Sequence, residues 1–216
     1  MFPYSCIALL LAHRLHTLSK ALPSVKLRWN VFGADVSPLA IQLASRNAAK
    51  LALPPHSISF VNADLFDDDS IDSVFCTAFV GQESERLHLV VSNPPYVTPH
   101  DYAHTLEPSV RNWEDERALV GVRPSEPVAP TSTQSEDDAA GLSFYRRIAA
   151  LCVRHAQLLP SSSQLSGEHS LPRLVLEVGH GQAQAVASII AAHSLSSCPP
   201  HIMQDAWGVE RVIQML

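Results

Sequence analysis

Residues 87–96 read Leu-His-Leu-Val-Val-Ser-Asn-Pro-Pro-Tyr, and they join a buried-type strand to an unusual tetrapeptide. The apolar and β-branched run over residues 87–91 predicts the strand. Pro94 and Pro95 have no N–H donors and hold the backbone extended, so we expect the carbonyls of this loop to point toward a ligand. A plain turn does not require this sequence, although a rigid exit from the strand without a catalytic role is the alternative interpretation.

Helical and strand patterns alternate along the rest of the chain. Helical spacing of apolar residues extends over residues 5–22, 37–51, 142–159 and 182–193. Short apolar runs predict strands over residues 30–34, 58–61 and 174–178, and a closing antiparallel pair within residues 201–215. This alternation predicts an α/β fold with a mostly parallel sheet, helices on both of its faces and an antiparallel C-terminal edge.

Length and composition fit one domain. The chain has 216 residues, of which 46% are hydrophobic, so it can bury one sizeable core. We therefore expect a single domain over residues 1–216. Residues 126–140 are polar and interrupted by prolines, which predicts a disordered insertion, and residues 161–171 predict a second polar loop.

The charge pattern argues against nucleic acid as a partner. The formal net charge is −6, and no run of Lys or Arg exceeds two residues, so no basic stripe can neutralise a phosphate backbone. The apolar stretch over residues 6–12 is too short to span a bilayer. We expect a monomer that binds neither nucleic acid directly nor a membrane.

Cysteine and histidine patterns predict no metal site. The four cysteines are far apart and form no C-x-x-C pair, and no histidine has a partner at metal-ligand spacing. A chain without a disulfide framework fits a reducing compartment. We expect the mitochondrion, with the cytoplasm as the alternative.

Two acidic residues follow predicted strands, at the edge where ligands bind in open α/β sheets. Asp35 could accept hydrogen bonds from both hydroxyls of a ribose, or it could cap the helix that begins near Ser37. Asp64 could receive an adenine amino group with Leu65 or Phe66 beside the ring, or it could belong to a solvated turn. Together with Asn93, these acids would line one crevice.

The tetrapeptide at residues 93–96 suits methylation of a planar nitrogen. The side-chain oxygen of Asn93 and the carbonyl of Pro94 can accept the two N–H protons of such a group. Pro95 keeps the backbone extended, and Tyr96 can pack on the planar face. These four residues are the predicted catalytic set, and they require neither a general base nor a metal.

Several segments, in the same order along the chain, resemble the HemK/PrmC family, which methylates the glutamine of the Gly-Gly-Gln motif in peptide-chain release factors. The segments are residues 5–12, 34–38, 91–97, 113–119, 141–148, 176–179 and 205–211. Each match is short, but their shared order makes them jointly specific. They extend over nearly the whole chain.

The resemblance implies a Rossmann-like fold that binds S-adenosylmethionine and methylates the side-chain amide of that glutamine. Asp35 would hold the ribose, and Asp64 with Leu65 would lie at the adenine. Asn93 would contact both the cofactor and the substrate amide, with Pro94, Pro95 and Tyr96 around it. The implied enzyme is a protein-(glutamine-N5) methyltransferase, and the implied partner is a peptide-chain release factor.

The chain departs from the family at its start. Residues 1–4 stand where the family has its first strand and glycine-rich loop, and no N-terminal helical domain precedes them. The resemblance is thus to a family member truncated at its N-terminus. We expect the sheet to lack a central strand and S-adenosylmethionine to bind weakly.

Two other interpretations fit the same residues. Adenine-N6 methyltransferases of nucleic acid share an Asn/Asp-Pro-Pro-Tyr loop, and the acidic charge counts against them. A non-catalytic remnant of a methyltransferase is the second alternative. Calorimetry with S-adenosylmethionine distinguishes that remnant from both enzymes.

Overall fold

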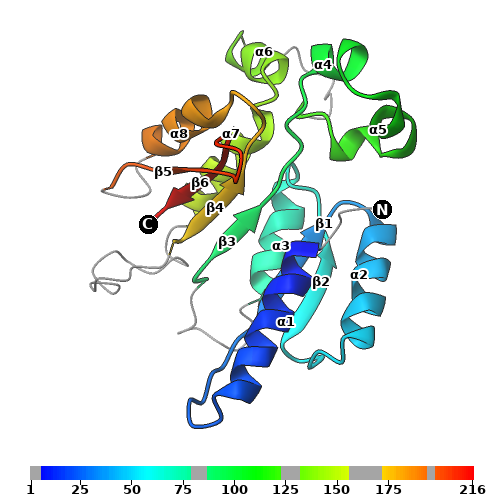
Figure 1. The fold of residues 1–216 in the computed structure, drawn as a ribbon, viewed down its shortest axis with the longest axis vertical. Coiled ribbons are helices and arrows are strands. Elements are labelled where there is room, and N and C mark those ends of the chain that lie inside the picture. Colours follow the sequence, from blue (N-terminus) through cyan, green and yellow to red (C-terminus); the bar gives the residue numbers. More distant parts are fainter. Residues whose placement is uncertain (1–5, 79–86, 123–131, 156–171, 194–197) are drawn as a thin grey trace. The chain divides into compact units, whose positions relative to one another are not determined.

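The computed structural model describes residues 6–78, 87–122, 132–155, 172–193 and 198–216 (Figure 1). The chain divides into two compact units, Met1–Glu83 and Ser84–Leu216, and each unit has buried residues of its own. The single domain predicted over residues 1–216 stays a prediction. No helix in the described part of the chain is long and apolar enough to cross a membrane.

The first unit alternates helices and strands, and the sequence predicted all of them except the last helix. Its elements are α1 (Cys6–Ala21), β1 (Val31–Asp35), α2 (Pro38–Lys50), β2 (Ile58–Asn62) and α3 (Asp68–Ala78). Strands β1 and β2 pair in parallel, with Val31 opposite Ile58 and Asp35 opposite Asn62. The parallel pairing brings the carboxyl ends of both strands to one edge of the sheet.

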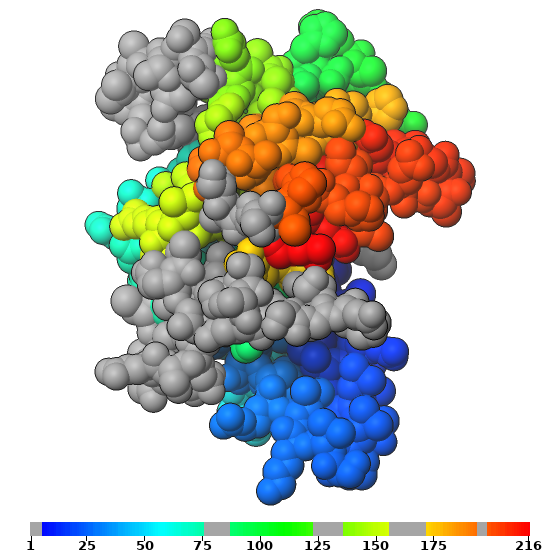
Figure 2. All heavy atoms as spheres, turned by 90° about the vertical axis from the view of Figure 1, so that its left-hand side faces the viewer, coloured from blue at the N-terminus to red at the C-terminus, as the bar shows by residue number. Residues whose placement is uncertain are grey.

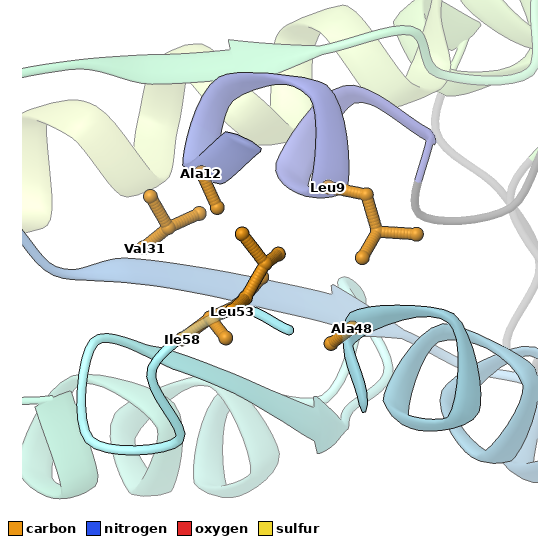
Figure 3. Close-up of a cluster of buried hydrophobic side chains, with 6 residues drawn as sticks. All are labelled: Leu9, Ala12, Val31, Ala48, Leu53 and Ile58. Atoms are coloured by element: carbon orange, nitrogen blue, oxygen red, sulfur yellow. The ribbon is translucent and has the colours of Figure 1, made fainter. Parts of the chain in front are cut away.

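Helix α1 packs on this sheet through one face. Leu9 and Ala12 are buried, whereas Leu10 is 71% exposed. The core cluster joins α1, both strands and α2 through Leu9, Ala12, Val31, Ala48, Leu53 and Ile58 (Figure 3). Gly33 leaves room for Phe60, because a Cβ at Gly33 would lie 2.7 Å from the Phe60 ring. Burial of a side chain such as Leu9 contributes about 1.5–3 kcal/mol.

The second unit contains the tetrapeptide and the C-terminal strands. Its elements are β3 (Val90–Ser92), α4 (Pro99–His104), α5 (Pro108–Trp113), the 3-10 helix η1 (Glu116–Ala118), α6 (Ser132–Ala139), α7 (Ser143–Arg154), β4 (Leu174–Glu177), α8 (Ala183–Ala192), β5 (His201–Gln204) and β6 (Glu210–Met215). The strand order is β3-β4-β6-β5. Strand β3 is parallel to β4, and β6 is antiparallel to both of its neighbours. The predicted antiparallel C-terminal edge is therefore confirmed.

The core of the second unit is built from its sheet and two helices. Helices α7 and α8 contact each other, and α8 also contacts β5 and β6. Figure 2 shows α8 and the C-terminal strands adjoining on one face. The largest fully buried side chains come from these elements and from the residue after β4, and they are Tyr145, Leu174, Leu176, Val178, Val186, Ile190, Ile213 and Met215.

Strands β1 and β3 each have one strand partner among the described residues. The described strands form a two-stranded sheet, β1-β2, and a four-stranded sheet, β3-β4-β6-β5. The N–H of Val31 donates to the Ser57 carbonyl at 2.9 Å, and backbone groups alternate along a strand. The backbone groups of Phe32 and Ala34 therefore point to the other edge of β1, where no described strand pairs.

Helix α6 corrects one expectation from the sequence. Residues 126–140 were expected to be a disordered insertion, but Ser132–Ala139 form a helix, and Asp137 within it is buried. The physical reason is electrostatic, because the Asp137 carboxylate pairs with the Arg146 guanidinium of α7. The expected polar loop at residues 161–171 lies outside the described residues, and the helix expected over residues 142–159 is α7.

Candidate functional site

The tetrapeptide at residues 93–96, called loop 93–96 below, leaves the sheet at the carboxyl end of β3. Asn93 is exposed, Pro94 is buried, and Pro95 and Tyr96 are half-buried. Two residues after the loop, the Thr98 hydroxyl accepts a hydrogen bond from the Asp101 N–H at 3.0 Å and caps α4. The loop is thus short and held between a strand and a capped helix, with its amide side chain facing solvent.

The backbone of the loop is anchored to the segment around η1. The N–H groups of Tyr96 and Val97 both donate to the Leu119 carbonyl, at 3.1 and 2.8 Å, and the Gly121 N–H donates to the Val97 carbonyl at 2.9 Å. The Asp115 carboxylate in turn accepts the Arg117 N–H at 3.0 Å and caps η1. Residues 113–119, one of the segments that resemble the family, therefore supply an anchor for the loop.

Tyr96 lies in a half-buried environment that keeps its phenol neutral. Burial, followed by the negative charge of Glu177, raises the pKa of Tyr96 above its usual value. The ring lies close to Gly179, since a Cβ at Gly179 would be 2.9 Å from Tyr96 Cδ2. The hydroxyl of the buried Tyr145 donates to the Glu177 carbonyl at 3.0 Å. Tyr96 can therefore offer a neutral aromatic face to a planar group.

Asp35 and Asp64 come together in the first unit, at the carboxyl ends of β1 and β2. The Asn62 side-chain amide donates to the Asp35 carbonyl at 2.9 Å, and the Ala63 N–H donates to the same carbonyl at 3.0 Å. The half-buried Leu65 follows Asp64 directly. The structure thus brings the two predicted acids to adjacent strand ends.

Both carboxylates also make local hydrogen bonds, although Ser37, and not Asp35, is the N-cap of α2. Asp35 Oδ1 accepts the Ser37 N–H at 2.8 Å, and Ser37 caps α2. Asp64 Oδ1 accepts the Phe66 N–H at 2.9 Å. These local bonds do not exhaust a carboxylate, which can accept about four hydrogen bonds. The ligand roles of Asp35 and Asp64 stay predictions beside these local bonds.

The predicted site residues fall into two groups. Asp35, Asp64 and Leu65 belong to the first unit, whereas Asn93 and the rest of loop 93–96 belong to the second. The single crevice predicted to contain both groups stays a prediction. Among the described residues, no three His, Cys, Asp or Glu side chains gather in a way that could hold a metal ion.

Two residues near loop 93–96 received no role from the sequence. Glu177 lies at the end of β4, and its negative charge raises the pKa of Tyr96. Gln182 precedes α8, and its side-chain amide donates to the Tyr96 carbonyl at 3.0 Å. Gln182 lies 86 residues from Tyr96 in the sequence. Periodic sequence patterns cannot predict a contact over such a separation. The segment at residues 176–179, which resembles the family, nevertheless lies just before Gln182 in the sequence.

The chain is similar to known glutamine methyltransferases. It is 28% identical over 186 residues to a release factor glutamine methyltransferase of Fusobacterium nucleatum, and the matched region covers 85% of this chain and 39% of the relative. It is 32% identical over 181 residues to a release factor glutamine methyltransferase of Rhodospirillum rubrum, and the matched region covers 84% of this chain and 42% of the relative. The resemblance predicted from the motifs is thus confirmed, and the chain spans less than half the length of these two curated relatives.

One solved structure was also found to be similar. It is a release factor-specific protein-(glutamine-N5) methyltransferase of Alicyclobacillus acidocaldarius, with 22% identity, a TM-score of 0.38, and coverage of 94% of this chain and 90% of that chain. A TM-score at this level adds nothing to the fold described above. A scan against protein-family models gives no match.

Proposed function

We propose that this chain carries the substrate site of a protein-(glutamine-N5) methyltransferase that acts on the Gly-Gly-Gln glutamine of a peptide-chain release factor. The observation that carries the proposal is loop 93–96, in which an exposed Asn93 follows β3 and the backbone behind it is anchored. The similarity to release factor glutamine methyltransferases supports it.

Different residues of loop 93–96 would bind different parts of a primary amide. The Asn93 side-chain oxygen and the Pro94 carbonyl accept the two N–H protons, which turns the nitrogen toward the methyl donor. The neutral ring of Tyr96 packs on the planar amide. Because an amide nitrogen loses its proton only after it has been methylated, no strong base needs to be held at the site.

We propose S-adenosylmethionine as the cofactor, and the chemistry of the donor set fits its adenosine part. Asp35 and Asp64 end adjacent strands and supply carboxylate oxygens suited to ribose hydroxyls and an adenine amino group. Leu65 is available beside the adenine ring. When bound, this cofactor supplies an electrophilic methyl group.

A methyltransferase acting on adenine in nucleic acid is the competing enzyme. It would place the same planar nitrogen against loop 93–96, but it must also neutralise phosphates. The formal net charge of −6 supports a protein substrate instead.

The test is to incubate the chain with S-adenosylmethionine and three substrates: a release factor, the same factor with the Gly-Gly-Gln glutamine replaced, and an adenine-containing oligonucleotide. We expect the mass of one added methyl group on the first substrate alone, with S-adenosylmethionine supplied at high concentration because weak binding is expected. Methylation of the oligonucleotide would favour the adenine enzyme. Absence of both cofactor binding by calorimetry and methyl transfer would favour the non-catalytic remnant.

A further inference from the structure

The side-chain amide of Gln182 joins three segments that are distant in sequence. Its Oε1 accepts the Gly179 N–H at 3.1 Å, and its Nε2 donates to the Tyr96 carbonyl at 3.0 Å and to the Ala140 carbonyl at 2.8 Å. A primary amide has two N–H donors, and both are used. Rotating the amide by half a turn would set its oxygen against two carbonyls, so the bonding fixes its orientation.

Three glycines surround this junction and let the backbones approach. A Cβ at Gly179 would lie 2.5 Å from Gln182 Oε1, and one at Gly141, where φ is +68°, would lie 2.5 Å from the Tyr96 carbonyl oxygen. A Cβ at Gly121 would lie 2.9 Å from the Pro95 carbonyl oxygen. The junction is therefore packed at backbone distance around the end of loop 93–96.

The loop needs such an external anchor because of its own sequence. Pro94 and Pro95 have no N–H groups, so this part of the backbone cannot bind neighbouring segments by donation. The Tyr96 N–H is bound to the Leu119 carbonyl, and the Tyr96 carbonyl is bound to Gln182. Both backbone groups of Tyr96 are thus fixed from outside the loop, while Asn93 stays exposed.

We infer that Gln182 is a positioning residue, which holds loop 93–96 in the geometry that presents Asn93, Pro94 and Tyr96 to the substrate amide. The link to catalysis rests on the proposed function, whereas the anchoring itself does not. A misplacement of the substrate by about 1 Å can cost about a hundredfold in rate, so such an anchor matters for turnover.

The test uses two variants at Gln182 and a control on the same helix. Gln182→Glu keeps an acceptor for the Gly179 N–H but loses both donors, and Gln182→Met loses all three bonds. Gln184→Met changes an exposed side chain of α8. We measure backbone hydrogen exchange, thermal unfolding, and the rate of methyl transfer to a release factor.

We expect exchange of the Tyr96, Val97 and Gly141 N–H groups to become about tenfold to a hundredfold faster in both Gln182 variants. The Gly179 N–H should stay protected in Gln182→Glu and lose protection in Gln182→Met. The Gln184→Met control should match the wild type throughout. In methyl transfer, kcat should fall about tenfold or more in Gln182→Glu, while KM for S-adenosylmethionine stays unchanged.

Exchange at residues 96, 97 and 141 that matches the wild type in both Gln182 variants would overturn the inference. So would global unfolding of both variants, since Gln182 would then serve the core rather than the loop. A wild-type chain that transfers no methyl group would contradict the proposed function alone, because the exchange result decides the anchoring without any activity.

Discussion

Asp137 of α6 and Arg146 of α7 form an ion pair in which the acid is almost completely inside the protein. Asp137 is 7% exposed, and Arg146 Nη2 donates to its Oδ1 at 2.9 Å. The next residue of α6, Asp138, accepts a hydrogen bond on its carboxylate from the Ser143 hydroxyl at the start of α7. One ion pair and one hydrogen bond thus connect the acidic end of α6 to the first turns of α7.

Asp137→Ala should lower the free energy of unfolding by about 1–3 kcal/mol, because Arg146 would lose its charged partner. The lower part of this range is expected, since the Arg146 side chain is 43% exposed and water can replace the lost partner. The measurement is chemical denaturation at neutral pH. Glu136→Ala, at an exposed position of the same helix, is the control and should change little.

Deletion of residues 127–138 should also destabilise the protein, by at least as much as Asp137→Ala. The polar composition of the segment, taken alone, would lead to the opposite expectation of a small change in melting temperature, because so polar a segment buries little apolar surface. The deletion removes both Asp137 and Asp138, so it also removes the pairing with Arg146 and Ser143. An unchanged melting temperature would contradict this prediction and favour the disordered insertion expected from the sequence.

This difference shows what periodicity in a sequence can and cannot predict. The apolar spacing predicted α1, α2, α7 and α8, and the runs beside Asp205 and Gly208 predicted the C-terminal hairpin, because in each case the pattern reflects one buried face. The stability of α6 depends on a tertiary ion pair, which no such pattern records.

The candidate site divides in the same way. Loop 93–96 was identified because two prolines after an apolar, β-branched run are informative by themselves. Gln182 was missed because its amide acts on backbone carbonyls of distant segments. Local hydrogen bonds of Asp35 and Asp64 could be expected from their positions just after strands, whereas their ligand roles stay predictions.

The stability of the protein should fall between about pH 9 and pH 11, partly because of Cys152. Burial raises the pKa of this thiol from its ordinary value of 9.0 to about 11. Between these values the folded state holds a proton that the unfolded state has lost, so the free energy of unfolding decreases as the pH rises. The thiol contributes a change on the order of 2–3 kcal/mol over this range, fully present below about pH 9.

Cys152→Ala isolates the thiol from other groups that titrate at high pH, such as the buried Tyr145. The variant loses some packing at all pH values, but its stability should decline less steeply between pH 9 and pH 11. Cys6→Ala, at an exposed thiol, should follow the wild-type curve. Equal slopes for wild type and Cys152→Ala would show that this thiol does not govern the decline.

Gly179→Ala should disturb loop 93–96 directly. The added Cβ would lie 2.5 Å from Gln182 Oε1 and 2.9 Å from Tyr96 Cδ2, so one of these groups must move. We expect a loss of about 1–3 kcal/mol in the free energy of unfolding, together with slower methyl transfer. Gly181→Ala is the matched control, since its Cβ would meet nothing within 4 Å and only the positive φ of +77° opposes it. The control should cost about 1 kcal/mol and leave transfer unaffected.

The most direct measurement of the central claim compares the methyl-transfer rate of wild type, Asn93→Ala and Asn112→Ala on a release factor at saturating S-adenosylmethionine. Asn112 is an exposed asparagine of α5 and serves as the control. If loop 93–96 orients the glutamine amide, Asn93→Ala should slow transfer about a hundredfold or more, with calorimetric affinity for S-adenosylmethionine nearly unchanged, and Asn112→Ala should match wild type. Undiminished transfer by Asn93→Ala would contradict the account.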